Sequence, residues 1–285
     1  MSLIGAALAQ LDNDKLLETY HKTLDRGLHG ICFSPYLPEQ EPGDPLSEEQ
    51  IQQRLDVIRP HTQWIRSFSC TEGNQAIPRI AKEKGLKTLV GAWLSDEKEK
   101  NKEEIENVVE IARQGYADIV AVGNEVLYRE ELEEDELLPL IQEVKEALPD
   151  TPVGYVDAYY EFSNRPALAD ACDVILANCY PYWEGCSIDY SLLYAKEMYR
   201  QAQSSAPGKR VIITESGWPS QGAAKGAAVP SMENARRYFI DLQTWAKEES
   251  LELFYFSSFD ETWKVSDEGD VGAHWGIWDT YGQLK

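Results

Sequence analysis

The chain of 285 residues is 43% hydrophobic and 27% charged, the composition of an ordinary globular protein, and no apolar run approaches the roughly 18 residues that span a bilayer. Its 27 Lys and Arg residues against 49 Asp and Glu residues give a formal net charge of −22, which repels nucleic acid and anionic lipid and suits a neutral substrate. No linker composition or internal repeat divides the chain, so we expect residues 1–285 to form one domain, and a monomer.

The first residues leave the question of export open. Residues 1–10 are apolar but lack the basic opening of a secretory signal, so either the protein is not exported or a signal has been removed. The stretch Asp12–Arg26 that follows is amphipathic.

Short runs rich in β-branched and aromatic residues then alternate with longer segments of helical periodicity, as in βα units around a parallel sheet. The eight predicted strands are Gly30–Pro35, Trp64–Cys70, Lys87–Leu94, Asp118–Glu125, Pro152–Tyr159, Asp173–Tyr180, Arg210–Gly217 and Glu252–Asp260. Predicted helices lie between them. One, Ser47–Ile58, opens with a Ser-x-x-Gln capping box, and another, Lys102–Arg113, carries an apolar stripe. The acidic run Arg129–Glu136 is typical of a solvated first helical turn.

Eight strands are the number that closes a barrel. A doubly wound open sheet usually has about five to seven strands and a Gly-rich first turn, which is missing here. We therefore predict an α/β fold, a single (β/α)8 TIM barrel. Because only about 25 residues follow the eighth run, the last outer helix should be short or missing, and Asp12–Arg26 could cover that part of the barrel.

Cysteines and histidines give no sign of a metal site. The five cysteines are odd in number and show no C-x-x-C spacing, so neither a zinc knuckle nor a full disulfide framework is indicated, and most should be small buried side chains. His21, His29, His61 and His274 are scattered, and only His274 is expected near a cleft. We expect no metal and no cofactor.

Two strands end in a carboxylate. The active site of such a barrel lies at the C-terminal strand ends, where the apolar run 118–125 ends in Glu125 and the run 210–217 carries Glu215. Two carboxylates across one cleft are what glycoside hydrolysis requires, since one protonates the leaving oxygen while the other attacks or stabilises the oxocarbenium-like centre. A single strand-end Glu could equally well cap a helix or pair with an Arg. Such a structural role explains two strand-end glutamates far less well.

Aromatic residues gather at the same strand ends. Aromatic faces stack on the C–H faces of sugars, although about half of these residues should instead line the core or brace loops. They are Tyr36, Tyr159, Tyr160, Tyr180, Tyr182, Trp183, Trp218, Phe259, Trp263 and Trp275.

With these residues in hand, the chain resembles glycoside hydrolase family 17, which contains β-1,3-glucanases and β-1,3-glucan glucanosyltransferases. The matching motifs are Val122-Gly123-Asn124-Glu125, Asn178-Cys179-Tyr180-Pro181-Tyr182, Thr214-Glu215-Ser216-Gly217-Trp218-Pro219-Ser220 and Phe259-Asp260-Glu261-Thr262-Trp263-Lys264. The opening Gly30–Tyr36 and the stretch Ile65–Phe68 match more weakly. Asn-Glu alone is a weak signal, whereas the second and third motifs at this spacing are specific.

The resemblance implies a retaining double displacement on a β-glucan, with Glu125 as acid/base and Glu215 as nucleophile, their carboxyl groups about 5–5.5 Å apart. It further implies that Asn124 binds the sugar 2-hydroxyl, that Tyr180 positions the nucleophile, and that Glu261 with Lys264 contacts the sugar or orients the acid. Trp218 and Trp275 would form sugar platforms. The remaining substrate-binding residues that it implies are Tyr36, Arg66, Tyr182 and Phe259. A secreted or periplasmic location is likewise expected by resemblance only.

Several alternatives stay open. Short loops, and a second strand that reads Ser-Phe where plant-type members have Leu-Tyr, leave chain-length preference undecided, and the covalent intermediate serves hydrolysis and glucanosyl transfer equally. A catalytically silent carbohydrate-binding barrel would usually lose one of the two glutamates. A barrel lyase or aldolase would need a strand-end Schiff-base Lys and a Gly-rich phosphate loop, and a metal-dependent hydrolase would need clustered ligands; the sequence has none of these features.

Overall fold

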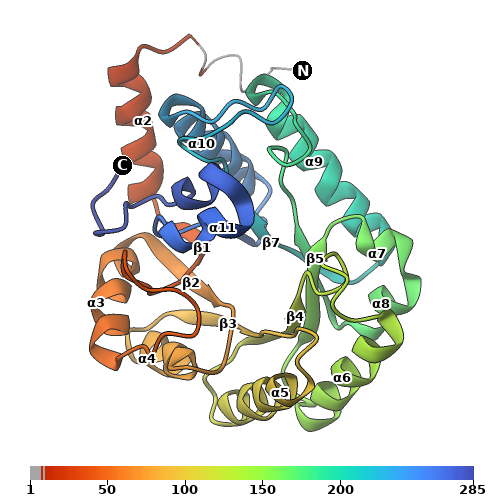
Figure 1. Cartoon of the computed structure of the whole chain (residues 1–285). Helices are drawn as coiled ribbons and strands as arrows, with labels where there is room; N and C mark the ends of the chain where they lie inside the picture. The colour runs from red at the N-terminus through yellow and green to blue at the C-terminus, as the bar shows by residue number, and fades with distance from the viewer. Residues whose placement is uncertain (1–7, 9) are drawn as a thin grey trace.

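The chain forms one closed barrel of eight parallel strands, paired in chain order from β1 to β8 and back to β1 (Figure 1). The structure is a computed structural model that describes residue 8 and residues 10–285, so most of the apolar opening lies outside the described residues. The strands are β1 (Leu28–Cys32), β2 (Thr62–Ser67), β3 (Lys87–Ala92), β4 (Ile119–Asn124), β5 (Val153–Ala158), β6 (Val174–Asn178), β7 (Arg210–Ser216) and β8 (Leu253–Tyr255). The predicted TIM barrel is confirmed.

Helices surround the barrel and connect the strands. They are α3 (Glu48–Ile58), α4 (Ile77–Glu83), α5 (Lys98–Arg113), α6 (Glu134–Ala147), α7 (Glu161–Asn164), α8 (Pro166–Ala171), α9 (Ile188–Ser205) and α10 (Met232–Glu248). The predicted capping box of α3 is half right: Ser47 accepts a hydrogen bond from the Gln50 amide, but the Gln50 side chain donates to the Pro35 carbonyl instead of returning to Ser47. Gln50 thereby ties α3 to the loop that follows β1.

The strands are shorter than the predicted runs because several runs continue past the last ladder hydrogen bond. β8 keeps only three residues of Glu252–Asp260, and a cis peptide bond joins Phe256 to Ser257 just beyond it. The β4–β5 pairing shifts register between Ala121 and Asn124. The residues beyond each strand end form the mouth of the barrel, which is where the polar side chains of interest lie.

Among the residues that the structure describes, no full outer helix follows β8, which agrees with the prediction that the last one is short or missing. After β8 the described chain has only the short helices η3 (Thr262–Lys264), α11 (Val265–Glu268) and η4 (Gly269–His274), of which η3 and η4 are 3-10 helices. The N-terminal helix α2 (Asn13–Asp25) packs beside α10 and closes the ring of helices (Figure 1). Tyr20 of α2 meets Phe239 of α10 edge to face, with ring centroids 5.0 Å apart.

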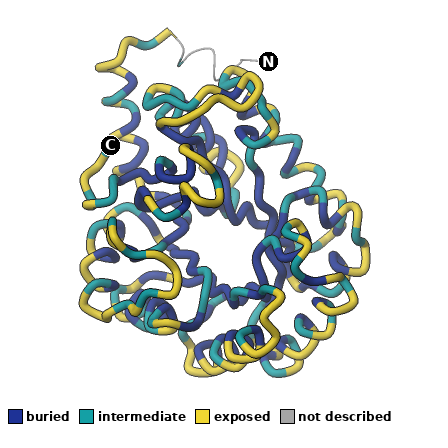
Figure 2. Tube along the Cα trace, viewed as in Figure 1, coloured by how far each residue is buried: buried dark blue, intermediate teal, exposed yellow. Residues whose placement is uncertain are grey.

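Burial follows the barrel, with buried residues along the strands and the inner helix faces and exposed residues on the outer turns (Figure 2). All five cysteines are free; four are buried, as predicted for most of them, and Cys186 is half-buried. Of the helices that the structure describes, none is both long and apolar enough to cross a membrane.

Candidate active site

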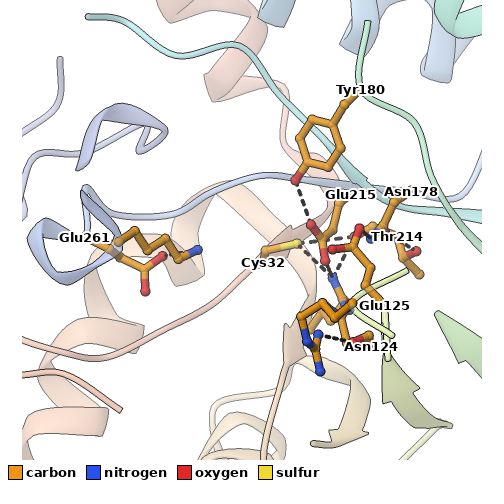
Figure 3. A network of polar contacts seen from close by, with 11 residues as sticks. Cys32, Asn124, Glu125, Asn178, Tyr180, Thr214, Glu215 and Glu261 are labelled. Carbon is orange, nitrogen blue, oxygen red and sulfur yellow. Dashed lines mark hydrogen bonds and ion pairs between the residues drawn. The ribbon is translucent and has the colours of Figure 1, made fainter. Parts of the chain in front are cut away.

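Glu125 and Glu215 line the same pocket at the barrel mouth, which has a volume of about 550 Å³. Figure 3 shows the two side chains among their polar contacts. Glu125 directly follows β4 and Glu215 lies near the end of β7. Gly123 has a φ of +91°, which suits glycine, and Glu125 itself has a φ of +52°. This backbone turn, held by a 2.8 Å hydrogen bond from the Glu125 amide to the Val156 carbonyl, turns the end of β4 at the pocket.

Glu215 is held by two donors. The buried Arg66 guanidinium of β2 forms an ion pair with one carboxylate oxygen, and the Tyr180 hydroxyl donates to the other at 2.7 Å. Arg66 also donates to the Asn124 side-chain oxygen at 2.6 Å. One buried cation therefore connects the end of β4 with the end of β7 and lies directly against the Glu215 carboxyl group, whose exposed fraction is 6%.

Glu125 has a different environment. Its described side-chain partner is the Asn178 amide, which donates at 2.8 Å, and Thr214 fixes the orientation of that amide by donating to its oxygen at 2.9 Å. Burial, and after it the negative charge of Glu215, raises the pKa of Glu125 to about 8. The two carboxyl groups thus have unlike environments, Glu215 beside a guanidinium and Glu125 beside a neutral amide, which suits a nucleophile next to a general acid.

Aromatic and acidic side chains complete the pocket. Trp275 lines it and donates through its indole nitrogen to Glu268 at 2.8 Å, while the Lys225 ammonium lies 4.9 Å from the centroid of the Trp183 ring. The other lining side chains come mostly from loops after β4, β5, β6 and β8, and they include Tyr128, Tyr159, Tyr160, Tyr180, Glu184, Phe256 and Asp267. Sequence reasoning did not single out Glu184, Lys225, Phe256 or Glu268, and it named Asn178 only as part of a motif.

Three predicted sugar-contacting aromatics lie beneath the surface instead. Trp218 is 1% exposed and donates through its indole nitrogen to the Val229 carbonyl at 3.1 Å, so it has no free face for a sugar and the platform prediction is wrong. Tyr182 is equally buried, and its ring packs against Trp218 and Trp275. Phe259 is covered by the Arg54 guanidinium at 3.7 Å. Tyr182 packs behind Trp183 and Trp275 of the pocket wall, and Trp218 packs behind Tyr182.

Glu261, Lys264 and Tyr36 are not among the residues that line this pocket, although the Lys264 ammonium lies 4.1 Å from the ring centroid of Phe256, which does. Lys264 pairs with Glu261 at 2.9 Å, and the Tyr36 hydroxyl accepts from Asn74 at 3.2 Å. Figure 3 shows Glu261 well apart from the two catalytic candidates. Glu261 is therefore not placed to orient the acid by direct contact, whereas contact of these three residues with a sugar stays a prediction.

Comparison with known proteins matches this geometry to one family. The model of the BtgE/BtgC glycoside hydrolase domain matches residues 30–276. A glucan 1,3-beta-glucosidase of Candida albicans is 30% identical over 261 residues, which is 81% of this chain and 83% of that protein. The crystal structure of a glycoside hydrolase family 17 beta-1,3-glucanosyltransferase from Rhizomucor miehei has a TM-score of 0.82 and 28% identity, over 92% of this chain and 96% of that one.

An active-site mutant of the same Rhizomucor miehei enzyme, in complex with laminaritriose, superimposes equally well, with the same TM-score, identity and coverage. The matched region contains all eight strands except the first two residues of β1, as well as both strand-end glutamates. The chain therefore belongs to the BtgE/BtgC glycoside hydrolase domain family, within glycoside hydrolase family 17, and it is a glycoside hydrolase.

Proposed function

We propose that this enzyme cleaves β-1,3-glucan with retention of configuration, with Glu125 as general acid/base and Glu215 as nucleophile. The observation that carries the proposal is the contrast between two carboxyl groups in one pocket. Glu215 is paired with Arg66 and Tyr180, whereas burial beside Glu215 keeps Glu125 protonated until about pH 8.

The reaction would run in two steps. Glu125 gives its proton to the glycosidic oxygen while Glu215 attacks the anomeric carbon, which releases the leaving sugar and forms a glycosyl ester. Glu125, now ionised, then takes a proton from an incoming hydroxyl that displaces Glu215. In this scheme Tyr180 and Arg66 orient the nucleophile and Asn178 orients the acid. Asn124, whose side-chain oxygen accepts from Arg66, would bind the sugar 2-hydroxyl.

Two observations support β-1,3-glucan as the substrate. The Candida albicans relative is named for action on 1,3-β-glucan, and laminaritriose is bound in the Rhizomucor miehei complex. The aromatic side chains of the pocket supply faces for glucose rings. We also infer that residues 1–285 form one catalytic domain and that Trp275 contacts the bound chain.

Glucanosyl transfer is the second candidate. The Rhizomucor miehei transferase spans nearly the same length as this chain at a TM-score of 0.82. In transfer, the hydroxyl that Glu125 deprotonates belongs to a second sugar chain instead of water, and the pocket must hold that acceptor. The aromatic residues on the Glu125 side, Tyr128, Tyr159 and Tyr160, could do so.

The test is product analysis by mass and linkage after incubation with purified β-1,3-gluco-oligosaccharides, with Glu215→Ala as the control. Products shorter than the starting sugar, and no longer ones, would identify a glucanase, whereas longer products would identify a transferase. No change with the wild-type enzyme would contradict the substrate proposal, and full activity of Glu215→Ala would contradict the nucleophile assignment.

A further inference from the structure

A buried polar pair on β5 lies against the turn that carries Glu125. Tyr155 and Asp157 are both 0% exposed, and the Tyr155 hydroxyl donates to the Asp157 carboxylate. They do not line the pocket, and the reaction scheme above does not use them. Two buried polar groups in the wall of an otherwise apolar strand cost stability unless they are fully hydrogen-bonded, so their partners indicate what they do.

Those partners belong mostly to the segment around Glu125. The Leu127 backbone N–H donates to the Tyr155 hydroxyl at 3.0 Å, and the backbone N–H of Tyr128 faces Asp157. On the other side of Glu125, the edge of the Tyr155 ring lies so close to Gly123 that a Cβ there would meet it at 3.2 Å. The β5 pair therefore contacts the turn both before and after the acid/base.

The turn needs such support because its backbone is unusual. The β4–β5 register shifts between Ala121 and Asn124, and Glu125 has a φ of +52°, a left-handed conformation that is unfavourable for a non-glycine residue. Such a conformation persists only where surrounding contacts fix it. The hydrogen bond that the Leu127 backbone N–H donates to the Tyr155 hydroxyl fixes the backbone two residues after Glu125 in the chain.

We propose that Tyr155 and Asp157 are positioning residues for Glu125, which hold the turn that aims its carboxyl group into the pocket. This inference rests on the proposed role of Glu125 as acid/base. Tyr155 acts through geometry alone, because its hydroxyl connects the turn to Asp157. Asp157 acts in addition through its charge, since it lies in the strand next to β4 and within electrostatic range of Glu125.

Four charged or polar groups from other strands of the barrel face Glu125 and shift its pKa. They are Glu215 from β7 and Asp157 from β5, which raise the pKa of Glu125, and Arg66 from β2 and the Asn178 amide from β6, which lower it. Burial raises the pKa of Asp157 itself to about 6, so Asp157 is ionised where Glu125 loses its proton. Removing the Asp157 charge should therefore lower the pH at which the acid is lost.

The test compares Tyr155→Phe, Asp157→Asn and Glu125→Ala on β-1,3-gluco-oligosaccharides and on an activated aryl β-glucoside, whose leaving group scarcely needs protonation. Tyr20→Phe is the matched control, because Tyr20 is also a buried tyrosine but lies on α2 against α10. Tyr155→Phe should lower kcat on the oligosaccharides about 10- to 100-fold with little change in KM, and lower turnover of the aryl substrate far less. Asp157→Asn should move the alkaline limb of kcat/KM down by about one pH unit.

Each outcome decides the inference. Tyr155→Phe activity equal to that of Tyr20→Phe, or equal losses on both substrates, would overturn the positioning role, and an unmoved alkaline limb in a folded Asp157→Asn would overturn the role of its charge. If Asp157→Asn does not fold, the substrate comparison with Tyr155→Phe decides alone. Glu125→Ala separates the two proposals: if it loses no more on oligosaccharides than on the aryl substrate, the acid/base assignment itself fails.

Discussion

Two residues of the same type are given opposite tasks by their neighbours. Glu215 has a guanidinium and a phenol hydroxyl on its two oxygens, whereas Glu125 has one amide donor and a buried position beside a like charge. The pKa of Glu125 near 8 is thus a property of the barrel mouth and not of the side chain. Removing the Arg66 side chain should disturb both glutamates, because Arg66 contacts Glu215 directly and also holds Asn124, the residue before Glu125.

The pH dependence of the reaction should report Glu125. Its protonated form is the active one in the first step, so kcat/KM on β-1,3-gluco-oligosaccharides should fall as pH rises through about 8. Glu125→Gln, which cannot give a proton, should lower kcat/KM about 10²- to 10⁴-fold and remove that limb, as measured by a pH series. A wild-type-like alkaline limb in the Gln variant would show that another group gives the proton.

The positions of the two candidate catalytic carboxyl groups could be predicted from the sequence, whereas the orientation of the aromatic side chains could not. Glu125 and Glu215 follow apolar runs, and strand ends meet at one face of a barrel, so their meeting could be foreseen. Trp218 also follows such a run, yet it turns inward to donate to Val229, because the direction of a loop side chain depends on packing that no local pattern encodes. Tyr155 and Asp157 were missed because two polar residues inside a strand look like any outward-facing pair.

Among the elements, α2 takes the place of a helix that the C-terminal segment does not supply. Its buried side chains, such as Leu16 and Leu24, face α10 and the barrel, and none of them lines the pocket of Glu125. The sequence predicted this substitution from the short tail and the amphipathic opening. It could not predict that β8 ends after three residues, because Glu252–Asp260 keeps its apolar character where the chain has already left the ladder.

The contribution of α2 can be measured with Leu24→Ala. The cavity left by a buried leucine should lower the free energy of unfolding by about 2–5 kcal/mol, while kcat/KM stays unchanged because the pocket is made by other elements. Thermal and denaturant unfolding would test this. Lys22→Ala, on the exposed face of the same helix and in a surface ion pair with Glu18, should change the free energy of unfolding far less than Leu24→Ala does. Equal effects of the two variants would mean that α2 does not seal the barrel.

For the whole molecule, a net charge of −22 makes stability depend on pH. Burial raises the pKa of Asp157 and of Asp241 to about 6, and that of Glu125 to about 8, so between pH 8 and 5 the folded chain binds more protons than the unfolded chain. Stability should therefore rise as pH falls across that range. Glu252 has the opposite sign: Arg210 and His29 hold its pKa at about 2, and the stability that it contributes is lost below about pH 4.

Thermal unfolding between pH 3 and pH 8 would test this prediction. The midpoint should be highest near pH 5 and lower on both sides, and added salt should raise it at pH 8 by screening the repulsion among carboxylates. Asp241→Asn should reduce the change of the unfolding midpoint with pH between pH 8 and 5. A midpoint that increases steadily up to pH 8 would contradict the assignment of these buried carboxyl groups.

Because the five free thiols differ in burial, chemical labelling should favour one cysteine of this molecule. Cys186 is the one half-buried cysteine, and it ends the loop Pro181–Cys186, which also carries Trp183 of the pocket wall. Burial raises the pKa of its thiol, so a maleimide dye should attach slowly and preferably at mildly alkaline pH, while the other four remain shielded. A fluorophore at this one position would report, in a folded enzyme with no engineered cysteine, when a glucan occupies the neighbouring pocket.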